Sequence, residues 1–184
     1  MEASVRSKKM SVAEYIRFEE RSDIRHEFDN GKLIAMAGTT DKHNDICHNI
    51  KAALKKQLKH TNCRIQVENV KVRIGENKRY TYPDVFVTCD DRDLADAYIK
   101  RYPSVIFEVL SDGTRVYDKT AKFMLYQKIE TLQHYILIEP ETIDIEIFSK
   151  NEKGEWSAQS LHQLMDNLIL SALNISVLVA DIYE

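Results

Sequence analysis

VIFEVL, residues 105–110, is the stretch of sequence that decides the fold. It is apolar apart from Glu108, which is typical of a strand buried on both faces of a sheet. Glu108 needs a physical explanation, because a buried carboxylate without a partner costs several kcal/mol or takes up a proton. A nearby Lys or Arg, a metal ion, or a solvent-exposed face of the strand would each accommodate it.

A second apolar stretch, DVFVTCD at residues 84–90, predicts another central strand. Around these two strands, the pattern predicts three helices and several further strands. The helices are expected at residues 10–20, 40–59 and about 116–130, a hairpin at 24–38 with its turn at Asn30-Gly31, strands at 63–74, 134–140 and 142–150, and a last short strand at 173–179. This order predicts an α/β fold, with a mixed central β-sheet flanked by helices and with an added N-terminal helix and hairpin.

The length of 184 residues suits a single domain, residues 1–184, whose core spans about 24–150. The N-terminal helix and the C-terminal strand are additions to this core. The formal net charge of −3 does not indicate a nucleic-acid-binding protein, although it leaves room for a local basic groove. The N-terminus lacks the apolar run of a signal peptide, and the apolar segment at residues 175–183 is too short to span a bilayer. We therefore expect a cytoplasmic protein without a membrane partner.

The three cysteines, Cys47, Cys63 and Cys89, are widely spaced along the chain. They form no CxxC pair, so a zinc site is not indicated. Their odd number does not suggest a disulfide framework. We expect buried, reduced thiols.

Asp84 and Glu108 are the first candidates for a functional site. Asp84 follows Pro83, which cannot donate to a sheet ladder and therefore suits the start of a strand. If the two strands are neighbours, about 4.8 Å apart, both carboxylates can share one Mg²⁺ or Mn²⁺ ion. The main-chain carbonyl of Val109 could supply a further oxygen ligand. The alternative is that Asp84 ends a loop and Glu108 pairs with an arginine.

Lys122 is the third candidate, because it lies near the middle of the apolar stripe of the helix at 116–130. The stripe consists of Ala121, Leu125, Tyr126 and Ile129. A lysine on a buried face needs a partner, and the two carboxylates are the obvious one. Lys119 and Lys128 lie away from the centre of the stripe. The alternative is a lysine whose amine reaches out to water.

Four spaced motifs together resemble one known family. They are HEFDNGKLIAMAG at residues 26–38, YPDVFV at 82–87, FEVLSDGTRVYDKTAKFMLY at 107–126 and LQHYILIE at 132–139. The set resembles the restriction-endonuclease domain family of the PD-(D/E)XK nuclease superfamily, from about residue 10 to the C-terminus. The spaced set is much more specific than any single motif.

The resemblance implies a restriction-endonuclease-like core and an endonuclease that hydrolyses DNA phosphodiester bonds with Mg²⁺ or Mn²⁺. By this resemblance, Asp84 and Glu108 bind the metal ion. The superfamily lysine is expected two residues after the second acid, where this chain has Leu110. The segment DKTAK, residues 118–122, resembles a family variant in which the lysine lies on the following helix, so Lys122 inherits the role of assisting the attacking water.

Glu27 and His43 also match positions typical of the family, where either would touch the metal site or its water. The alternatives are a salt bridge within the hairpin for Glu27 and a simple helix-terminal histidine for His43. A rival to the nuclease function is a catalytically inactive DNA-binding or protein-interaction domain on the same fold.

Basic residues and an apolar C-terminal segment suggest partners. Lys51, Lys55 and Lys59 share one helix face. A second basic group consists of Lys71, Arg73, Lys78 and Arg79. Both groups could meet DNA phosphates, although a solvated helix face is the more frequent explanation of such a pattern. The apolar segment at 174–183 and the frequency of two-fold assemblies lead us to expect a homodimer.

Overall fold

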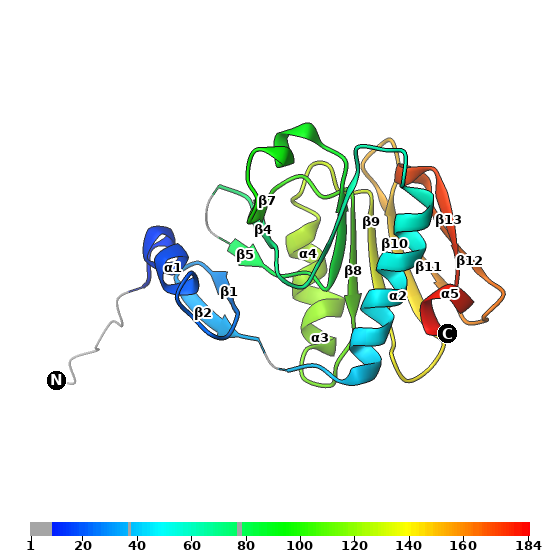
Figure 1. Cartoon of the computed structure of the whole chain (residues 1–184), viewed down its shortest axis with the longest axis horizontal. Coiled ribbons are helices and arrows are strands. Elements are labelled where there is room, and N and C mark those ends of the chain that lie inside the picture. Colours follow the sequence, from blue (N-terminus) through cyan, green and yellow to red (C-terminus); the bar gives the residue numbers. More distant parts are fainter. Residues whose placement is uncertain (1–8, 37, 77–78) are drawn as a thin grey trace.

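A six-stranded mixed sheet forms the centre of the molecule and contains both apolar strands (Figure 1). The structure is a computed structural model that describes residues 9–36, 38–76 and 79–184. The strand order is β11-β10-β9-β8-β6-β3, in which β8 and β9 are parallel and the other neighbours antiparallel. These strands are β3 (Arg64–Val67), β6 (Val85–Thr88), β8 (Val105–Val109), β9 (His134–Ile138), β10 (Ile145–Lys150) and β11 (Trp156–Leu161). The expected mixed α/β architecture is confirmed.

Two helical segments cover opposite faces of this sheet (Figure 1). Helix α2 (Asp41–Gln57) packs its apolar side chains on one face. The other face is covered by a continuous segment of α3 (Arg115–Tyr117), η2 (Asp118–Lys122) and α4 (Phe123–Tyr126). Because side chains alternate along a strand, Glu108 points to the same face as Ile106, which packs in the core on the α4 side. None of the helices described is long and apolar enough to cross a membrane.

A five-stranded second sheet carries the N-terminal helix. Its order is β2-β1-β5-β4-β7, and its strands are β1 (His26–Asp29), β2 (Lys32–Ala35), β4 (Lys71–Ile74), β5 (Arg79–Thr81) and β7 (Ile99–Lys100). The expected hairpin is present as β1 and β2, with positive φ angles of 49° at Asn30 and 95° at Gly31 in the turn. Helix α1 (Val12–Glu19) begins with a capping box between Ser11 and Glu14 and packs Tyr15 against the sheet.

One expected strand, residues 63–74, is in fact two strands in two different sheets. β3 ends at Val67, and Glu68 adopts a positive φ of 56° before β4 begins at Lys71. This turn passes the chain from the central sheet to the second sheet. The expectation of extended structure was correct for both strands, but hydrophobicity alone does not mark the change of direction between them.

The C-terminal part contains more secondary-structure elements than the one strand expected there. β12 (Asn167–Leu170) and β13 (Ile175–Leu178) form a separate hairpin, joined by η3 (Ser171–Leu173), and α5 (Ala180–Tyr183) follows. The apolar side chains of Val177, Val179 and Ile182 are buried in the core beneath α2. This segment therefore packs within its own chain and gives no support to the expected homodimer.

Cys63 and Cys89 form a disulfide, so the expectation of reduced thiols is wrong for these two residues. The antiparallel pairing of β3 with β6 places them opposite each other, one position beyond the Arg64–Thr88 pair, with Cα atoms 4.0 Å apart. Cys47 is a free, buried cysteine in α2, as expected. The 26-residue separation of the bonded pair gave no sequence signal, because their contact depends on strand register.

Candidate active site

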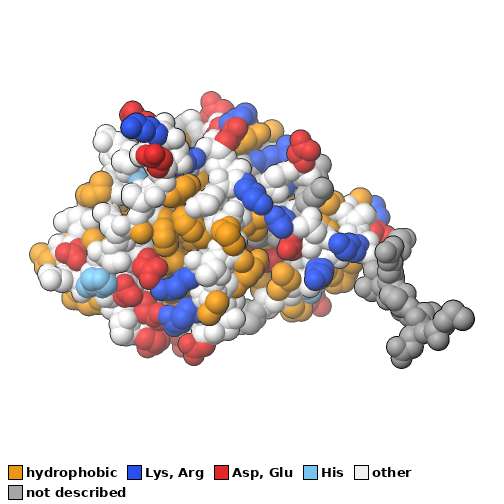
Figure 2. Space-filling model, turned by 180° about the vertical axis from the view of Figure 1, so that it is seen from behind, with side chains coloured by type: hydrophobic (Ala, Val, Ile, Leu, Met, Phe, Trp, Pro, Cys, Tyr) orange, Lys and Arg blue, Asp and Glu red, His pale blue; other side chains and the backbone are white. Residues whose placement is uncertain are grey.

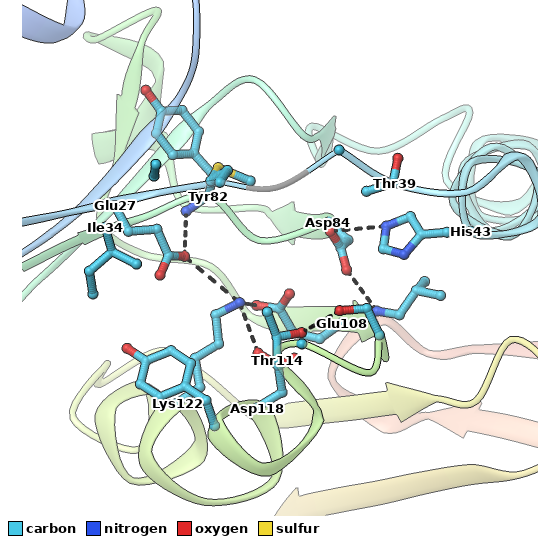
Figure 3. A pocket seen from close by; sticks show the side chains of 17 residues that line it. Glu27, Ile34, Thr39, His43, Tyr82, Asp84, Glu108, Thr114, Asp118 and Lys122 are labelled. Carbon is cyan, nitrogen blue, oxygen red and sulfur yellow. Dashed lines mark hydrogen bonds and ion pairs between the residues drawn. The ribbon is translucent and has the colours of Figure 1, made fainter.

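A pocket of about 500 Å³ brings together all the candidate residues of the sequence (Figure 3). These residues are Glu27, His43, Asp84, Glu108, Val109 and Lys122. They come from β1, α2, the start of β6, β8 and η2, so the pocket forms only when both sheets and both helical segments are in place. We call it the acidic pocket, because four carboxylates line it, those of Glu27, Asp84, Glu108 and Asp118.

Asp84 and Glu108 lie opposite each other on neighbouring antiparallel strands. The last paired residues are Val85 and Phe107, so Asp84 and Glu108 occupy the next opposite position and point to the same face of the sheet. The main-chain N–H of Val109 donates a hydrogen bond of 2.7 Å to Asp84 Oδ2. This bond fixes one carboxylate oxygen beside the end of β8. The metal-binding roles of Asp84, Glu108 and the Val109 carbonyl stay predictions.

Glu108 is 2% exposed and receives two donors on the same oxygen. Lys122 Nζ lies 2.9 Å from Oε1, and the hydroxyl of Tyr126 donates to Oε1 at 2.8 Å. Both of these contacts are made by Oε1, and no hydrogen bond joins the other oxygen, Oε2, to the residues that the structure describes. Burial raises the pKa of Glu108 well above its usual value, and the negative charge of Asp84 adds to this, although Lys122 opposes it.

Lys122 reaches Glu108 from a π-helical turn, η2, formed by DKTAK. Such turns are rare and are found frequently at functional sites. Lys122 Nζ lies 3.1 Å from Asp118 Oδ1 and 3.8 Å from Glu27 Oε1. Burial lowers the pKa of the amine, but the surrounding carboxylates, Glu108 first, outweigh burial and raise it well above its usual value. The amine therefore points into the pocket as an ammonium ion.

Glu27 and His43 complete the walls from the two sides. Glu27 Oε1 accepts a hydrogen bond of 3.3 Å from the main-chain N–H of Tyr82. His43, in the first turn of α2, places Nε2 3.3 Å from Asp84 Oδ1. Burial disfavours the charged form of His43, but the adjacent carboxylate of Asp84 and the more distant ones of Glu68 and Asp118 raise its pKa overall. Both side chains thus contact the charged groups of the pocket, as Figure 3 shows.

Two residues that the sequence did not single out as site residues belong to this cluster. Asp118 is 2% exposed and pairs with Lys122 four residues later. Tyr126 lies four residues after Lys122 and holds Glu108. The spacing i, i+4 was the available signal, since such residues share a helix face. Asp118 was overlooked although it lies on the same helix face as the apolar stripe, and Tyr126 was assigned to the apolar stripe alone.

The donor set of the acidic pocket fits a hard divalent cation. Mg²⁺ prefers oxygen ligands and usually keeps several waters, so it needs only one or two carboxylates from the protein. The acidic pocket is lined by four carboxyl groups but by only one amine, that of Lys122, so acidic side chains outnumber basic ones. Among the residues described, no three His, Cys, Asp or Glu side chains are arranged as a complete protein cage for a metal. Asp84, Glu108 and the Val109 carbonyl remain the predicted ligands of such an ion, with water supplying the others.

The basic residues expected to meet DNA do not line this pocket. Lys51 and Lys55 are exposed on α2, about two and three turns beyond His43, and Lys59 is exposed just after the end of the helix. Lys78 falls outside the described residues. In the view of Figure 2, the Lys and Arg side chains described are scattered among acidic and apolar ones and form no continuous basic stripe.

Comparisons with known proteins identify a family and a similar fold. A family model, Uma2, described as "Putative restriction endonuclease", matches residues 12–180. Two proteins of Synechocystis sp. are similar to the chain: uncharacterized protein slr1290 is 35% identical over 176 residues, covering 96% of this chain and 92% of its own, and uncharacterized protein sll1609 is 32% identical over 152 residues, covering 82% and 86%. The fold is similar to the crystal structure of a putative nuclease of the DUF820 family from Anabaena variabilis, with a TM-score of 0.79, 16% identity, and coverage of 95% of this chain and 97% of that one.

Proposed function

Because the chain belongs to the Uma2 family of restriction-endonuclease type, we propose that it is a nuclease that hydrolyses DNA phosphodiester bonds with Mg²⁺ or Mn²⁺. In this proposal, Asp84 and Glu108 bind the metal ion, and Lys122 acts on the attacking water and on the developing charge. The family match supports the proposal because residues 12–180 include every one of these positions.

The observation that carries the proposal is the unbalanced negative charge of the acidic pocket. Four carboxylates surround one ammonium, and Glu108 has a pKa raised by burial. Such an arrangement is costly in the absence of a cation, because like charges at short range oppose ionisation. A divalent ion between Asp84 and Glu108 would remove most of this cost.

The remaining groups are well placed to support hydrolysis. A bound Mg²⁺ ion would polarise a phosphoryl oxygen and lower the pKa of a coordinated water. Lys122, held between Glu108 and Asp118, would orient the attacking water and stabilise negative charge on the phosphoryl group. Tyr126 holds Glu108 Oε1, which leaves Oε2 for the ion, and the Val109 N–H holds Asp84 in its orientation.

Calorimetric titration with Mn²⁺ and a cleavage assay on DNA test this proposal together. We expect the wild-type protein to bind Mn²⁺ and cleave DNA, and Asp84→Asn and Glu108→Gln to weaken Mn²⁺ binding at least tenfold and to abolish cleavage. Glu130→Gln is the matched control, because Glu130 is an exposed carboxylate that pairs with Arg92. Absence of Mn²⁺ binding by the wild-type protein would refute the proposal. Metal binding without cleavage of duplex or single-stranded DNA would favour the inactive binding domain instead.

A homodimer and a cytoplasmic location belong to the same proposal. Two-fold dimers are the commonest assemblies, and a nuclease that cuts both strands of a duplex would use two copies of the site. Sedimentation at micromolar concentration measures the assembly directly.

The Cys63–Cys89 disulfide counts against a cytoplasmic location, since disulfides are rare in the cytoplasm. Fractionation of cells that produce the protein tests its location.

A further inference from the structure

A second pocket, of about 480 Å³, adjoins the acidic pocket along the outer side of α4. It is lined by Asp29, Arg79, Tyr117, Ala121, Met124, Leu125, Gln127 and Lys128, and we call it the helix-side pocket. Tyr117 lines both pockets and forms the partition between them. The helix-side pocket is therefore one direction in which a chain bound in the acidic pocket could continue.

The net charge of its lining residues distinguishes the helix-side pocket from two other pockets that adjoin the acidic pocket. The helix-side pocket has two cations, Arg79 and Lys128, against Asp29, which leaves a net charge of +1. One of these adjoining pockets shares Gly38, Thr39, His43 and Ser111 with the acidic pocket. Its charged residues are Arg115 against Asp112, Glu139 and Glu141, a net charge of −2.

The other adjoining pocket shares Asp84 and the segment near Gly38 with the acidic pocket. It contains Arg25 against Glu68 and Asp84, a net charge of −1. Of these three pockets, only the helix-side pocket has lining residues with a positive net charge. A polyanion held at the metal site is therefore repelled along two directions and attracted along one.

The walls of the helix-side pocket suit a base next to a phosphate. Tyr117, Ala121, Met124 and Leu125 supply an apolar surface, and Met124 is 61% exposed. Lys128 is exposed and has no ion pair with any residue in the described part of the chain. Aromatic faces bind bases by stacking, which requires that the base is not stacked within a duplex.

We propose that the helix-side pocket binds the nucleotide adjacent to the scissile phosphate, with its base against the ring of Tyr117 and its outer phosphate at Lys128. This inference rests on the proposed nuclease function. It adds that the enzyme prefers DNA that is single-stranded, or locally unpaired, next to the cleavage position. Tyr117 sets this preference, because it divides the pocket of the chemistry from the pocket of the neighbouring base.

Fluorescence anisotropy with a labelled single-stranded oligonucleotide in Ca²⁺ tests the subsite. Tyr117→Leu removes the ring, and we expect it to weaken binding about tenfold, whereas Tyr117→Phe keeps the ring and binds like wild type. Tyr98→Leu is the matched control, since Tyr98 is 74% exposed outside both pockets. Equal losses in Tyr117→Phe and Tyr117→Leu would show that the hydroxyl, not stacking, matters, and would overturn the inference.

Salt dependence tests the contact of Lys128. Lys128→Met should reduce the slope of log Kd against log salt concentration by about 0.7, the value for one phosphate contact on a single strand. Lys55→Met, on the exposed face of α2, should leave that slope unchanged. If Lys55→Met reduces the slope and Lys128→Met leaves it unchanged, the DNA contacts α2 instead, and the inference is overturned. If the wild-type protein binds Mn²⁺ but no DNA, the nuclease proposal fails as well, whereas DNA binding that is unaffected by Tyr117 and Lys128 defeats the subsite alone.

Discussion

Lys122 and Glu108 form an ion pair of 2.9 Å in which both side chains are less than a tenth exposed. The pair explains how a carboxylate is tolerated in the middle of the apolar strand β8. Removing one partner of a buried pair leaves the other charge uncompensated, so both sides of the pair can be tested by substitution.

Lys122→Met keeps most of the aliphatic stem and removes the charge. We expect the variant to bind Mn²⁺ at least as tightly as wild type, because a positive charge is lost from the pocket. DNA cleavage should fall by about two orders of magnitude or more, since the ammonium can no longer stabilise developing charge. Initial cleavage rates and Mn²⁺ calorimetry measure the two effects.

Lys119→Met is the matched control for this substitution. Lys119 lies on the same helical segment but pairs with Glu146 at 2.5 Å, and its side chain is one third exposed. We expect little loss of cleavage. Similar losses in the two lysine variants would contradict the role given to Lys122.

The raised pKa of Glu108 predicts how the stability of the metal-free protein depends on pH. The unfolded chain loses this proton near pH 4.5, whereas the folded protein keeps it to higher pH. The stabilisation is therefore complete below pH 4.5 and is lost as the pH rises through the raised value. We expect the unfolding free energy in EDTA to decrease over that range, and Glu108→Gln to remove the decrease. Urea unfolding at a series of pH values measures it, and a flat wild-type profile would count against the raised pKa.

Tyr126→Phe removes the hydrogen bond to Glu108 Oε1 without removing the ring. The unfolding free energy should fall by about 1–3 kcal/mol, because the buried carboxyl group of Glu108 loses one of its hydrogen-bond donors. The affinity for Mn²⁺ should change as well, since Glu108 is less firmly oriented. Tyr183→Phe is a suitable comparison, because that hydroxyl donates to the main-chain carbonyl of Glu139 and does not touch the acidic pocket. Its Mn²⁺ affinity should equal that of wild type.

His134 predicts a loss of stability in mild acid. It is buried, it contacts Ser149 and Ser171 through its two ring nitrogens, and burial lowers its pKa to about 4. The unfolded chain takes up a proton near pH 6.5, so the stabilisation is complete above 6.5 and declines as the pH falls towards 4. His134→Gln should have a flatter profile over this range than wild type, and His162→Gln, at an exposed position, should not. Identical profiles for all three proteins would show that His134 is not held neutral.

The Cys63–Cys89 disulfide predicts one free thiol, that of Cys47, when the unreduced protein is denatured and titrated. Because the bond closes a loop of about 26 residues, reduction should lower the unfolding free energy by about 2–4 kcal/mol. The double variant Cys63→Ser/Cys89→Ser should be insensitive to reductant. Three titratable thiols would contradict the disulfide.

Two residues of the acidic pocket were predictable because they interrupt regular patterns, whereas Glu27 and His43 were expected only from the family resemblance. Glu108 interrupts an apolar strand, and Lys122 interrupts an apolar helix stripe, so each pointed to a buried partner. The disulfide was not predictable, because it depends on the register between β3 and β6. The π turn at DKTAK was hidden too, since uniform helical spacing assigns 100° to every residue. The division of residues 63–74 between two sheets depends on the backbone at Glu68, which hydrophobicity does not report.

Two adjacent residues of strand β1, His26 and Glu27, contact different parts of the molecule. His26 pairs with Glu19 at the end of α1, and Glu27 faces Lys122 in the acidic pocket. Glu19 also accepts a hydrogen bond from the Tyr82 hydroxyl, while the Tyr82 N–H donates to Glu27. The N-terminal helix is thus mechanically linked to a carboxylate of the pocket through one residue of backbone. The position of Glu27 beside Lys122 therefore depends on contacts that reach as far as the N-terminal helix, outside the central sheet.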